Sequence, residues 1–462
     1  MYASTYNSVI PMDSGEAVLF NSLSGALFVL DRRIASAIGR GDCGSVDNSI
    51  LQYLKKDNIL YDSIDDEKAH VSFTAEMVKK SQESERIRYH VVPTLGCNIS
   101  CSYCDRGGDR DSMSASQAAK VIEAIEYVEE LTSGSHAPLL ILDGGEPLSL
   151  QEEVRESCST LLDLADERDF HVAFRTNGVT LSEYAADLTQ YYVEYVDVPV
   201  DGTKSYHDRR RRSQKGGTFD DIVTGIETAL DCGLQVNLRL QVSSHNLMEA
   251  PAMAEFIMDK TWHLARNFRA LLCPLEDFSC YGFRTCRPDY SILKDVLELY
   301  QAHAAMELFT LTGFFEISSL LYLLESGVSL RPRLSPCDAG KALYCFDPYN
   351  TIYPCVAACM MRTSPVGMYQ PEMTVFPALD QWRTRSVFTV DSCLSCPFCF
   401  VCGGGCTLQA TTHGAVTKPQ CRPVDTALQL ACAEYLSENR ARESSFIYFD
   451  NIFIPKKEIT FP

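Results

Sequence analysis

The first 78 residues show the pattern of a small module built from a hairpin and two helices. Two apolar runs flank the polar segment Asn21–Gly25, which is typical of two strands joined by a turn. Asp31 follows the second run and stands where it can cap the next helix. We expect a winged-helix-like unit at 1–78 and a polar linker at 79–87. The expected elements are strands at 17–20, 26–30 and 59–61, helices at 32–38 and 47–54, and an acidic turn after the last strand.

From 88 to 269, apolar strand patterns alternate with amphipathic helix patterns. The strand patterns are short and rich in Val, Leu, Ile and Tyr. Such regular repetition predicts an α/β fold with a parallel sheet, either open or closed into a barrel. The expected strands are 89–93, 139–142, 172–175, 195–200 and 236–242, and the expected helices are 116–131, 154–167, 182–190 and 220–232.

The rest of the chain differs in character. Residues 270–336 are expected to bridge two domains, with a mostly helical pattern over 290–324. From Cys337 to Cys432 the sequence holds eleven cysteines, many Pro and Gly and few long periodic runs. We therefore expect a domain at 337–435 that is held together by bound ligands more than by a hydrophobic core. The sequence assigns no role to the tail at 436–462.

Composition narrows the possible functions. The 462 residues carry a formal net charge of -20, which argues against a surface that follows nucleic-acid phosphates. No apolar run reaches the ~18–20 residues that cross a bilayer, and no secretory signal is visible at the start. The 20 cysteines imply disulfides, metal or both. We expect a cytoplasmic protein whose thiolates bind metal, with no nucleic-acid or membrane partner.

The first cysteine group follows the first strand of the alternating region. Cys97, Cys101 and Cys104 have the spacing Cys-x3-Cys-x2-Cys within one loop. Three such thiolates can hold three irons of a [4Fe–4S] cluster and leave the fourth iron open for another ligand. A zinc site or a chance group is the alternative, although structural zinc sites use four protein ligands.

This loop, with Tyr103 before its last cysteine, resembles the signature of radical S-adenosylmethionine (SAM) enzymes. A second motif, Gly144-Gly145-Glu146-Pro147, follows the next strand, as the resemblance requires. The resemblance implies a partial (β/α)6 barrel similar to a TIM barrel, a [4Fe–4S] cluster on the three cysteines, and SAM bound to the open iron. The cofactor contacts that it implies come from Tyr103, Gly144, Gly145, Glu146, Pro147, Asn177 and Asp201.

A following segment fits this resemblance in part. His207, Asp208 and Arg211 resemble a loop that faces the active site in the family, whereas Arg209 and Arg210 are interpreted as a solvated basic turn. Pro199 stands where many relatives place a Ser that contacts the SAM ribose, so the resemblance does not extend to that contact.

The C-terminal cysteines resemble the SPASM extension of radical SAM enzymes that modify peptides. Their spacing is Cys-x2-Cys-x5-Cys-x3-Cys from Cys393 to Cys406, preceded by two cysteines around Asn350 and followed by Cys421. The resemblance implies two auxiliary clusters and therefore three [4Fe–4S] clusters in all. The nearer one would use Cys337, Cys345, Cys355 and Cys406, and the outer one Cys393, Cys396, Cys402 and Cys421. The other cysteines, among them Cys273, Cys359, Cys399 and Cys432, are interpreted as small buried residues.

The hairpin of the first module resembles the PqqD-type element, which binds a leader peptide as an added strand. Together the resemblances imply a leader-dependent maturase that cross-links a ribosomally made precursor peptide through a 5′-deoxyadenosyl radical, with a flavodoxin or ferredoxin-type reductant. A thioether is the first expectation for the new bond, and carbon–carbon or carbon–oxygen cross-linking and epimerisation are the alternatives. A non-enzymatic iron–sulfur electron carrier or sensor is the rival from another class. The sequence indicates no catalytic base, precursor or oligomeric state.

Overall fold

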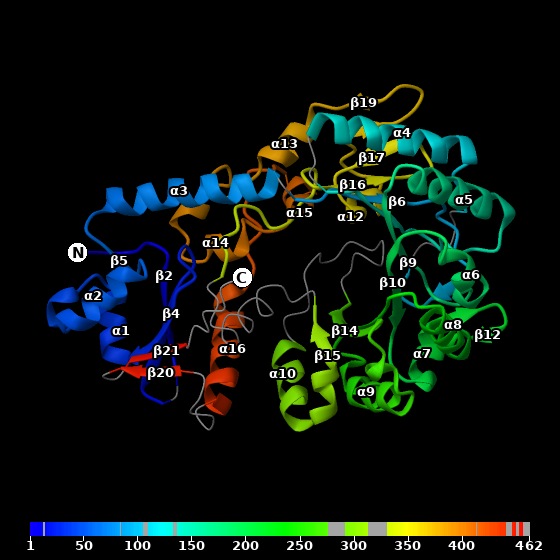
Figure 1. Cartoon of the computed structure of the whole chain (residues 1–462). Coiled ribbons are helices and arrows are strands. Elements are labelled where there is room, and N and C mark those ends of the chain that lie inside the picture. The colour runs from blue at the N-terminus through cyan, green and yellow to red at the C-terminus, as the bar shows by residue number, and fades with distance from the viewer. Residues whose placement is uncertain are drawn as a thin grey trace. The chain divides into compact units, whose positions relative to one another are not determined.

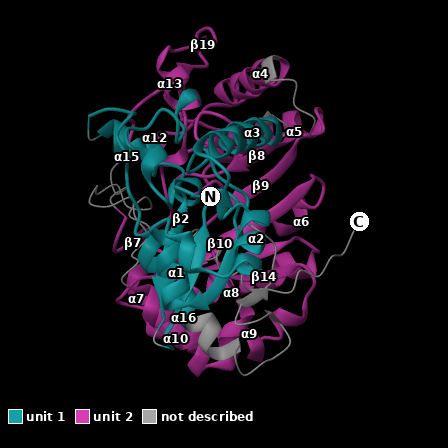
Figure 2. Cartoon of the chain, turned by 90° about the vertical axis from the view of Figure 1, so that its left-hand side faces the viewer, with its two compact units in different colours: residues 1–82, 314–337, 384–462 teal, residues 83–313, 338–383 magenta. Residues whose placement is uncertain are grey.

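The computed structural model describes residues 1–12, 14–83, 85–104, 110–132, 136–275, 292–312, 330–412, 414–439, 446–449 and 452–455. The chain forms two compact units (Figure 2): unit 1 holds 1–82, 314–337 and 384–462, and unit 2 holds 83–313 and 338–383. The cysteine-rich region expected at 337–435 is thus divided between the two units. None of the helices in the described part of the chain is long and apolar enough to cross a membrane.

Unit 2 is built on an eleven-stranded sheet in the order β15-β14-β13-β10-β9-β8-β6-β16-β17-β18-β19. Neighbours from β15 to β16 pair in parallel, whereas β16 to β19 pair antiparallel. The strands of this sheet are β6 (Arg88–Val91), β8 (Leu139–Leu142), β9 (His171–Arg175), β10 (Val193–Val200), β13 (Val236–Val242), β14 (Phe268–Pro274), β15 (Phe309–Leu311), β16 (Leu343–Phe346), β17 (Thr351–Tyr353), β18 (Gly367–Met368) and β19 (Thr374–Val375).

Helices connect the parallel strands and follow one another along the sheet (Figure 1). All strands and helices expected between 88 and 269 form, with bounds within two residues of the prediction. The strands were recognisable because parallel strands are buried on both faces, as in β8, whose four residues are all buried. These helices are α4 (Ala115–Thr132), α5 (Glu152–Asp166), α6 (Leu181–Leu188), α7 (Lys204–Arg210), α8 (Phe219–Asp231), α9 (Ala250–Asp259) and α10 (Leu293–Ala302). Two further helices, α12 (Val356–Met360) and α13 (Ala378–Thr384), follow the antiparallel strands β17 and β19.

Two expectations for the bridging region need correction. The alternating region does not end at 269, because β14 continues to Pro274 and supplies a sixth βα repeat. The helical expectation over 290–324 holds for α10, but Phe309–Leu311 is strand β15, which pairs in parallel with β14. The hydrophobic spacing of Phe309–Leu311 gave no local sign that this segment pairs with the distant strand β14. Residues 290–291 and 313–324 of that expectation lie outside the described residues.

Unit 1 contains the predicted N-terminal hairpin within a five-stranded sheet in the order β2-β3-β4-β21-β20. The Asp31 side chain accepts a hydrogen bond from the Arg33 backbone N–H at 2.8 Å and caps α1, as predicted. The C-terminal hairpin extends the sheet, with Phe453 opposite Val29 in antiparallel pairing. The elements are β1 (Tyr2–Ala3), β2 (Asn7–Pro11), β3 (Glu16–Asn21), β4 (Leu27–Asp31), α1 (Arg32–Gly39), α2 (Asn48–Lys56), β5 (Leu60–Tyr61), β20 (Phe446–Phe449) and β21 (Ile452–Pro455).

The acidic turn and the start of the linker are instead one helix, α3 (Ile64–Glu83). Asp65, Asp66 and Glu67 lie in its first turn, where negative side chains interact favourably with the positive end of the helix dipole. The acidic run that suggested a turn is therefore part of what stabilises the start of the helix.

The cysteine-rich part of unit 1 has a hydrophobic core, contrary to expectation. Val18, Phe20 and Val29 of the hairpin pack with buried residues that include Val401 and Leu428. Tyr6 packs edge-on against Phe400, with ring centroids 4.8 Å apart. The N-terminal module is thus not a separable cap, because its removal would expose the core that it shares with the cysteine-rich part. The remaining helices there are α14 (Cys399–Cys402), α15 (Thr407–Thr412) and α16 (Val424–Asn439).

Candidate active site

A cavity of about 660 Å³ in unit 2 brings the two N-terminal motifs together. It is lined by all three cysteines of the first loop, and by Tyr103, Gly144, Gly145 and Asn177 among the predicted cofactor contacts. The loops after β6, β8 and β9 supply these groups, and loops after the carboxyl ends of parallel strands are where ligand sites of such sheets lie. Glu146, Pro147 and Asp201 are not among the lining residues.

A small second sheet anchors the cysteine loop. Ile99–Cys101 forms β7, which pairs antiparallel with β11 (Arg211–Ser213) and places Cys101 opposite Arg211. β12 (Gly216–Gly217) completes this sheet. The Ser102 N–H also donates to the Arg210 carbonyl at 2.7 Å. The metal-binding loop is therefore fixed to the segment after β10, an arrangement that the sequence did not indicate.

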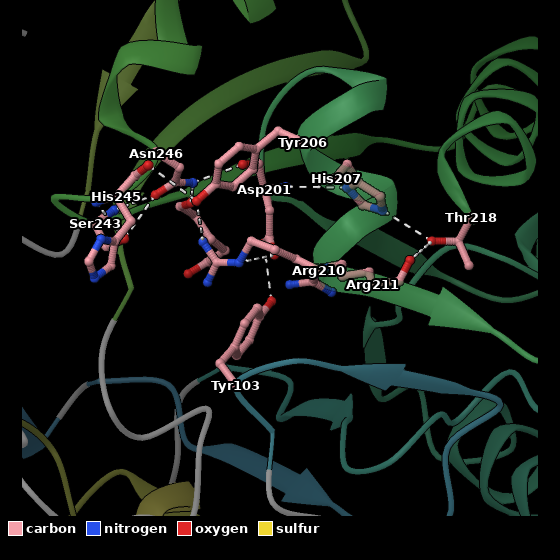
Figure 3. A network of polar contacts seen from close by, with 11 residues as sticks. Tyr103, Asp201, Tyr206, His207, Arg210, Arg211, Thr218, Ser243, His245 and Asn246 are labelled. Carbon is pink, nitrogen blue, oxygen red and sulfur yellow. Dashed lines mark hydrogen bonds and ion pairs between the residues drawn. The ribbon is translucent and has the colours of Figure 1, made fainter. Parts of the chain in front are cut away.

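Asp201 is fully buried at the centre of a polar network (Figure 3). Its Oδ1 accepts hydrogen bonds from the Tyr103 hydroxyl and from Arg211 Nε, both at 3.1 Å, and its Oδ2 lies 3.4 Å from Arg210 Nε. The Arg210 guanidinium also lies over the Tyr103 ring, 4.6 Å from its centroid. The interpretation of Arg210 as solvated is wrong, because only 14% of its side chain is exposed. Asp201 thus supports the cavity wall from behind.

His207 belongs to the same network and is a neutral hydrogen-bonding residue. Its Nδ1 accepts from the Asp201 N–H at 3.3 Å, and its Nε2 lies 3.1 Å from Thr218 Oγ1, which itself donates to the Arg211 carbonyl. Burial lowers the pKa of His207 to about 4, and the positive charge of Arg211 acts in the same direction. These contacts assign the proton to Nε2.

Glu146 links the glycine turn to the end of β9. Its buried carboxyl group accepts hydrogen bonds from Leu148 N–H at 2.8 Å, Thr176 Oγ1 at 2.6 Å and Asn177 N–H at 2.7 Å. Asn177 Nδ2 then donates to Asn98 Oδ1 at 2.6 Å, within the cysteine loop. Burial raises the pKa of Glu146 to about 7, against the effect of these hydrogen bonds. Glu146 therefore positions Asn177.

The residues present fit the cofactors that the resemblance implies. A Cβ at Gly145 would lie 2.0 Å from the Gly96 carbonyl oxygen, so only glycine lets the turn approach the cysteine loop. The Gly145 N–H donates to the Thr94 carbonyl and the Gly144 N–H to Asp143 Oδ1. The turn can consequently offer carbonyl oxygens, which are acceptors suited to the amino group of SAM. Beside it, the three thiols supply the donor set of an iron–sulfur cluster.

The cavity lining also carries charges from adjacent strands of the sheet. Asp143 and Asp197 bind the guanidinium of Arg175, at 3.3 and 3.7 Å, and Asp197 also binds Arg239 at 3.2 Å. The Arg175 side chain is 41% exposed, and all four residues line the cavity. These residues were not singled out from the sequence, because each lies within or just after an apolar strand, where an isolated charge carries no motif.

The C-terminal cysteines fall into groups in the structure. In unit 1, the pKa of Cys393 is raised to about 11 by burial and then by the neighbouring thiols of Cys402, Cys396 and Cys421, so the four predicted outer ligands lie together. The pKa of Cys406 is raised mainly by burial and further by the neighbouring Cys337. Both cysteines belong to unit 1. Cys345 and Cys355 belong to unit 2.

Cys345 has a neighbour that the sequence did not indicate. It is fully buried and its thiol is hydrogen-bonded to Cys359, while burial and the charges of Cys359 and Cys355 keep its pKa well above the usual value. Among the described residues, no group of three or more His, Cys, Asp or Glu side chains is placed closely enough to hold a metal ion. The assignment of ligands to each cluster stays a prediction.

Comparison with known proteins supports the resemblance. Residues 91–257 match the family model of the Radical SAM superfamily. A protein of Archaeoglobus fulgidus is 23% identical over 70% of this chain and 77% of its own length. A probable GTP 3′,8-cyclase of Methanopyrus kandleri is 29% identical over 36% of this chain, and the match spans only about half, 51%, of that protein.

Two solved structures share the fold. Streptococcus suis SuiB has a TM-score of 0.54 and 13% identity, with 92% of this chain and 99% of SuiB covered. The protein anSMEcpe has a TM-score of 0.54 and 16% identity, with 78% of this chain and 94% of that one covered. SuiB has been solved with SAM and with the precursor peptide SuiA, and anSMEcpe with SAM and the Cp18Cys peptide.

The family match and the cavity agree, because the matched segment contains the three cysteines and the glycine turn that the cavity brings together. Residues 91–257 are therefore a radical SAM domain, the core of an enzyme that uses SAM and a [4Fe–4S] cluster.

Proposed function

We propose that the chain is a leader-dependent radical SAM maturase that installs cross-links, with a thioether as the new bond, in a ribosomally made precursor peptide. The observation that carries the proposal is the extent of the likeness to SuiB, which spans 92% of this chain and 99% of a protein solved with its precursor peptide. The cysteine spacing from Cys337 to Cys421 supports it independently.

In this proposal the loop cysteines hold the cluster and the glycine turn holds the amino group of SAM. A bound cluster and SAM would supply one-electron chemistry that removes a hydrogen atom from the substrate. The chain's own contribution is position: Asp201 fixes Tyr103 against the loop, and Glu146 fixes Asn177 against Asn98. Arg175 and Arg239 offer guanidinium groups in the lining of the same cavity, where they can hold carboxylate or carbonyl oxygens of a peptide.

Leader recognition is proposed for the sheet of unit 1. An added strand would gain main-chain hydrogen bonds from a sheet edge, while side-chain pockets select the sequence. A flavodoxin or ferredoxin-type reductant would supply the electron that starts SAM cleavage. The auxiliary clusters would carry the surplus electron away from the substrate radical once the cross-link forms, since cluster potentials are tuned over a wide range by ligation and surroundings.

The test is coexpression with short reading frames that neighbour the gene, followed by mass spectrometry of each peptide. A thioether lowers the peptide mass by two hydrogens and removes one alkylatable cysteine thiol. Loss of two hydrogens with every thiol still alkylatable indicates a carbon–carbon or carbon–oxygen bond, and unchanged mass with altered chirality indicates epimerisation. If the anaerobically reconstituted protein cleaves no SAM in the presence of reductant, the enzymatic proposal fails and an electron carrier or sensor remains.

A nucleotide cyclase is the second candidate, favoured by the relative in Methanopyrus kandleri and by the positive lining of the cavity. Five arginines and two aspartates line it: Arg110, Arg175, Arg211, Arg212 and Arg239, with Asp143 and Asp197. Such a lining could also bind a triphosphate. Adding GTP to the SAM-cleavage assay separates the candidates, because a cyclase consumes GTP and a peptide maturase leaves it unchanged.

A further inference from the structure

Arg385 is a buried cation in the cysteine-rich part of unit 1. Only 2% of the residue is exposed, and it is among the largest fully buried side chains of the described chain. Its Nη2 donates to the carbonyl oxygens of Gly404 at 2.8 Å, Gly405 at 3.2 Å and Lys418 at 3.2 Å, and its Nη1 donates to the Val416 carbonyl. One guanidinium thus joins two separate backbone segments.

Both segments carry predicted cluster ligands. Gly404 and Gly405 belong to the loop between Cys402 and Cys406, while Val416 and Lys418 lie in the segment that leads to Cys421. By tying these carbonyls together, Arg385 fixes the spacing of ligands from both auxiliary clusters.

The loop needs its three glycines to reach this position. Gly403, Gly404 and Gly405 all have left-handed backbones, with φ of 66°, 85° and 72°. A Cβ at Gly403 would lie 2.4 Å from the Ser335 carbonyl carbon, and one at Gly405 would lie 1.7 Å from the Gln420 carbonyl oxygen. The loop therefore lies directly against residues that neighbour Cys337 and Cys421.

The charges around Arg385 can offset the cost of burying its guanidinium group. Burial lowers the pKa of Arg385. Negative charge on four neighbouring cysteines, as thiolates, raises this pKa in turn: Cys393, Cys406, Cys337 and Cys402. A buried charge is costly unless an opposite charge lies nearby. A cluster ligated by thiolates is an anion, so the metal-loaded state would supply that opposite charge at this place.

We propose that Arg385 is a positioning residue of the auxiliary iron–sulfur clusters, which sets the spacing of their ligand loops and raises their reduction potentials with its positive charge. This inference rests on the proposed function, because that proposal assigns the auxiliary clusters. A nearby cation raises a cluster potential because the reduced cluster carries one more negative charge than the oxidised one.

The experiment compares the full-length reconstituted protein with Arg385→Gln, Arg385→Lys and the control Arg40→Gln, which changes an exposed arginine of the same unit. Iron and sulfide are counted per chain, and the potentials are measured by a redox titration followed by electron paramagnetic resonance. We expect Arg385→Gln to shift the auxiliary signals to more negative potential and to leave the SAM-binding cluster unchanged. Arg385→Lys keeps the charge and should stay close to the wild-type potentials, as should the control.

The remaining outcomes for iron content and reduction potential either support or overturn the role of Arg385. If Arg385→Gln loses auxiliary iron while Arg385→Lys retains it, the positive charge is needed to hold the clusters, which supports the inference. Equal iron loss in both variants, equal potential shifts in both, or unchanged potentials in Arg385→Gln would overturn the electrostatic role. Wild-type protein that holds only about 4 Fe per chain would instead refute the auxiliary clusters themselves, before any variant is compared.

Discussion

Replacing Asp201 by Asn tests whether the network behind the cavity holds the cysteine loop. The substitution keeps the shape of the side chain and one acceptor oxygen, but it removes the negative charge that lies between Arg210 and Arg211. Both guanidinium groups are largely buried, with 14% and 7% of their side chains exposed, so water cannot replace the lost partner.

The expected cost follows from that burial. Removing one partner of a buried ion pair costs about 3–5 kcal/mol, because the remaining charge stays buried without compensation. The retained amide oxygen can still accept from the Tyr103 hydroxyl, which limits the loss, and we expect unit 2 to lose about 3 kcal/mol. With a slope of about 3 kcal/mol per M urea, its unfolding midpoint should fall by about 1 M.

Tryptophan fluorescence is a suitable assay, because the chain has two tryptophans and both Trp262 and Trp382 lie in unit 2. Asp231→Asn is the matched control, since the same change at an exposed aspartate should shift stability by no more than about 0.5 kcal/mol. The loosened loop should also lower the iron retained on Cys97, Cys101 and Cys104. An Asp201→Asn protein that unfolds with the control and keeps all its iron would refute the reasoning.

Three further predictions concern the metal sites and the pH dependence. Replacing Cys97, Cys101 and Cys104 together by Ala should lower the iron from about 12 to about 8 per chain and abolish SAM cleavage; unchanged iron contradicts the ligand assignment. Cys402→Ala should lower soluble yield and iron to about 8 per chain but leave SAM cleavage intact, whereas Cys43→Ala, a half-buried cysteine outside the pattern, should change neither. The third follows from His207, whose pKa is about 4 in the folded protein and 6.5 in the unfolded chain. Between these values the unfolded chain binds the extra proton, so unit 2 should lose about 3 kcal/mol as the pH falls from 6.5 to 4, and His207→Gln should lack this dependence.

The sequence predicted five strands and four helices of unit 2 for a physical reason, whereas α7, α9 and β14 were not expected. Strands such as β8 are short apolar runs between amphipathic helices, and this contrast can be read from a short window of the sequence. Pairings between distant segments leave no such local sign. β16 joins the sheet beside β6 although Tyr344 and its partner Tyr89 are 255 positions apart in the chain.

The site was predictable as a set of motifs but not as a network. Arg209 to Arg212 is a basic run that suggests solvation, yet β11 pairs with β7 and so buries Arg211 while Arg212 stays exposed. Asp201 could be identified from its strand end, but its contact with Tyr103 joins residues 98 positions apart. The helix α3 was missed because its acidic first turn resembles a loop when the helix dipole is ignored.

The pairing of β21 with β4 has a consequence for any peptide that joins the sheet of unit 1. A segment of the same chain is present at a high effective concentration, of millimolar order for a short tether, so a free peptide competes with it on unequal terms. A peptide strand that enters beside β4 must first displace β21. The apparent affinity of the peptide therefore falls in proportion to the fraction of molecules in which β21 has left β4. Among the strands of the described residues, none pairs with the outer side of β2, so a peptide that enters there displaces no strand of the described chain. The affinity of the sheet for a peptide therefore depends on which of these two strands the peptide joins.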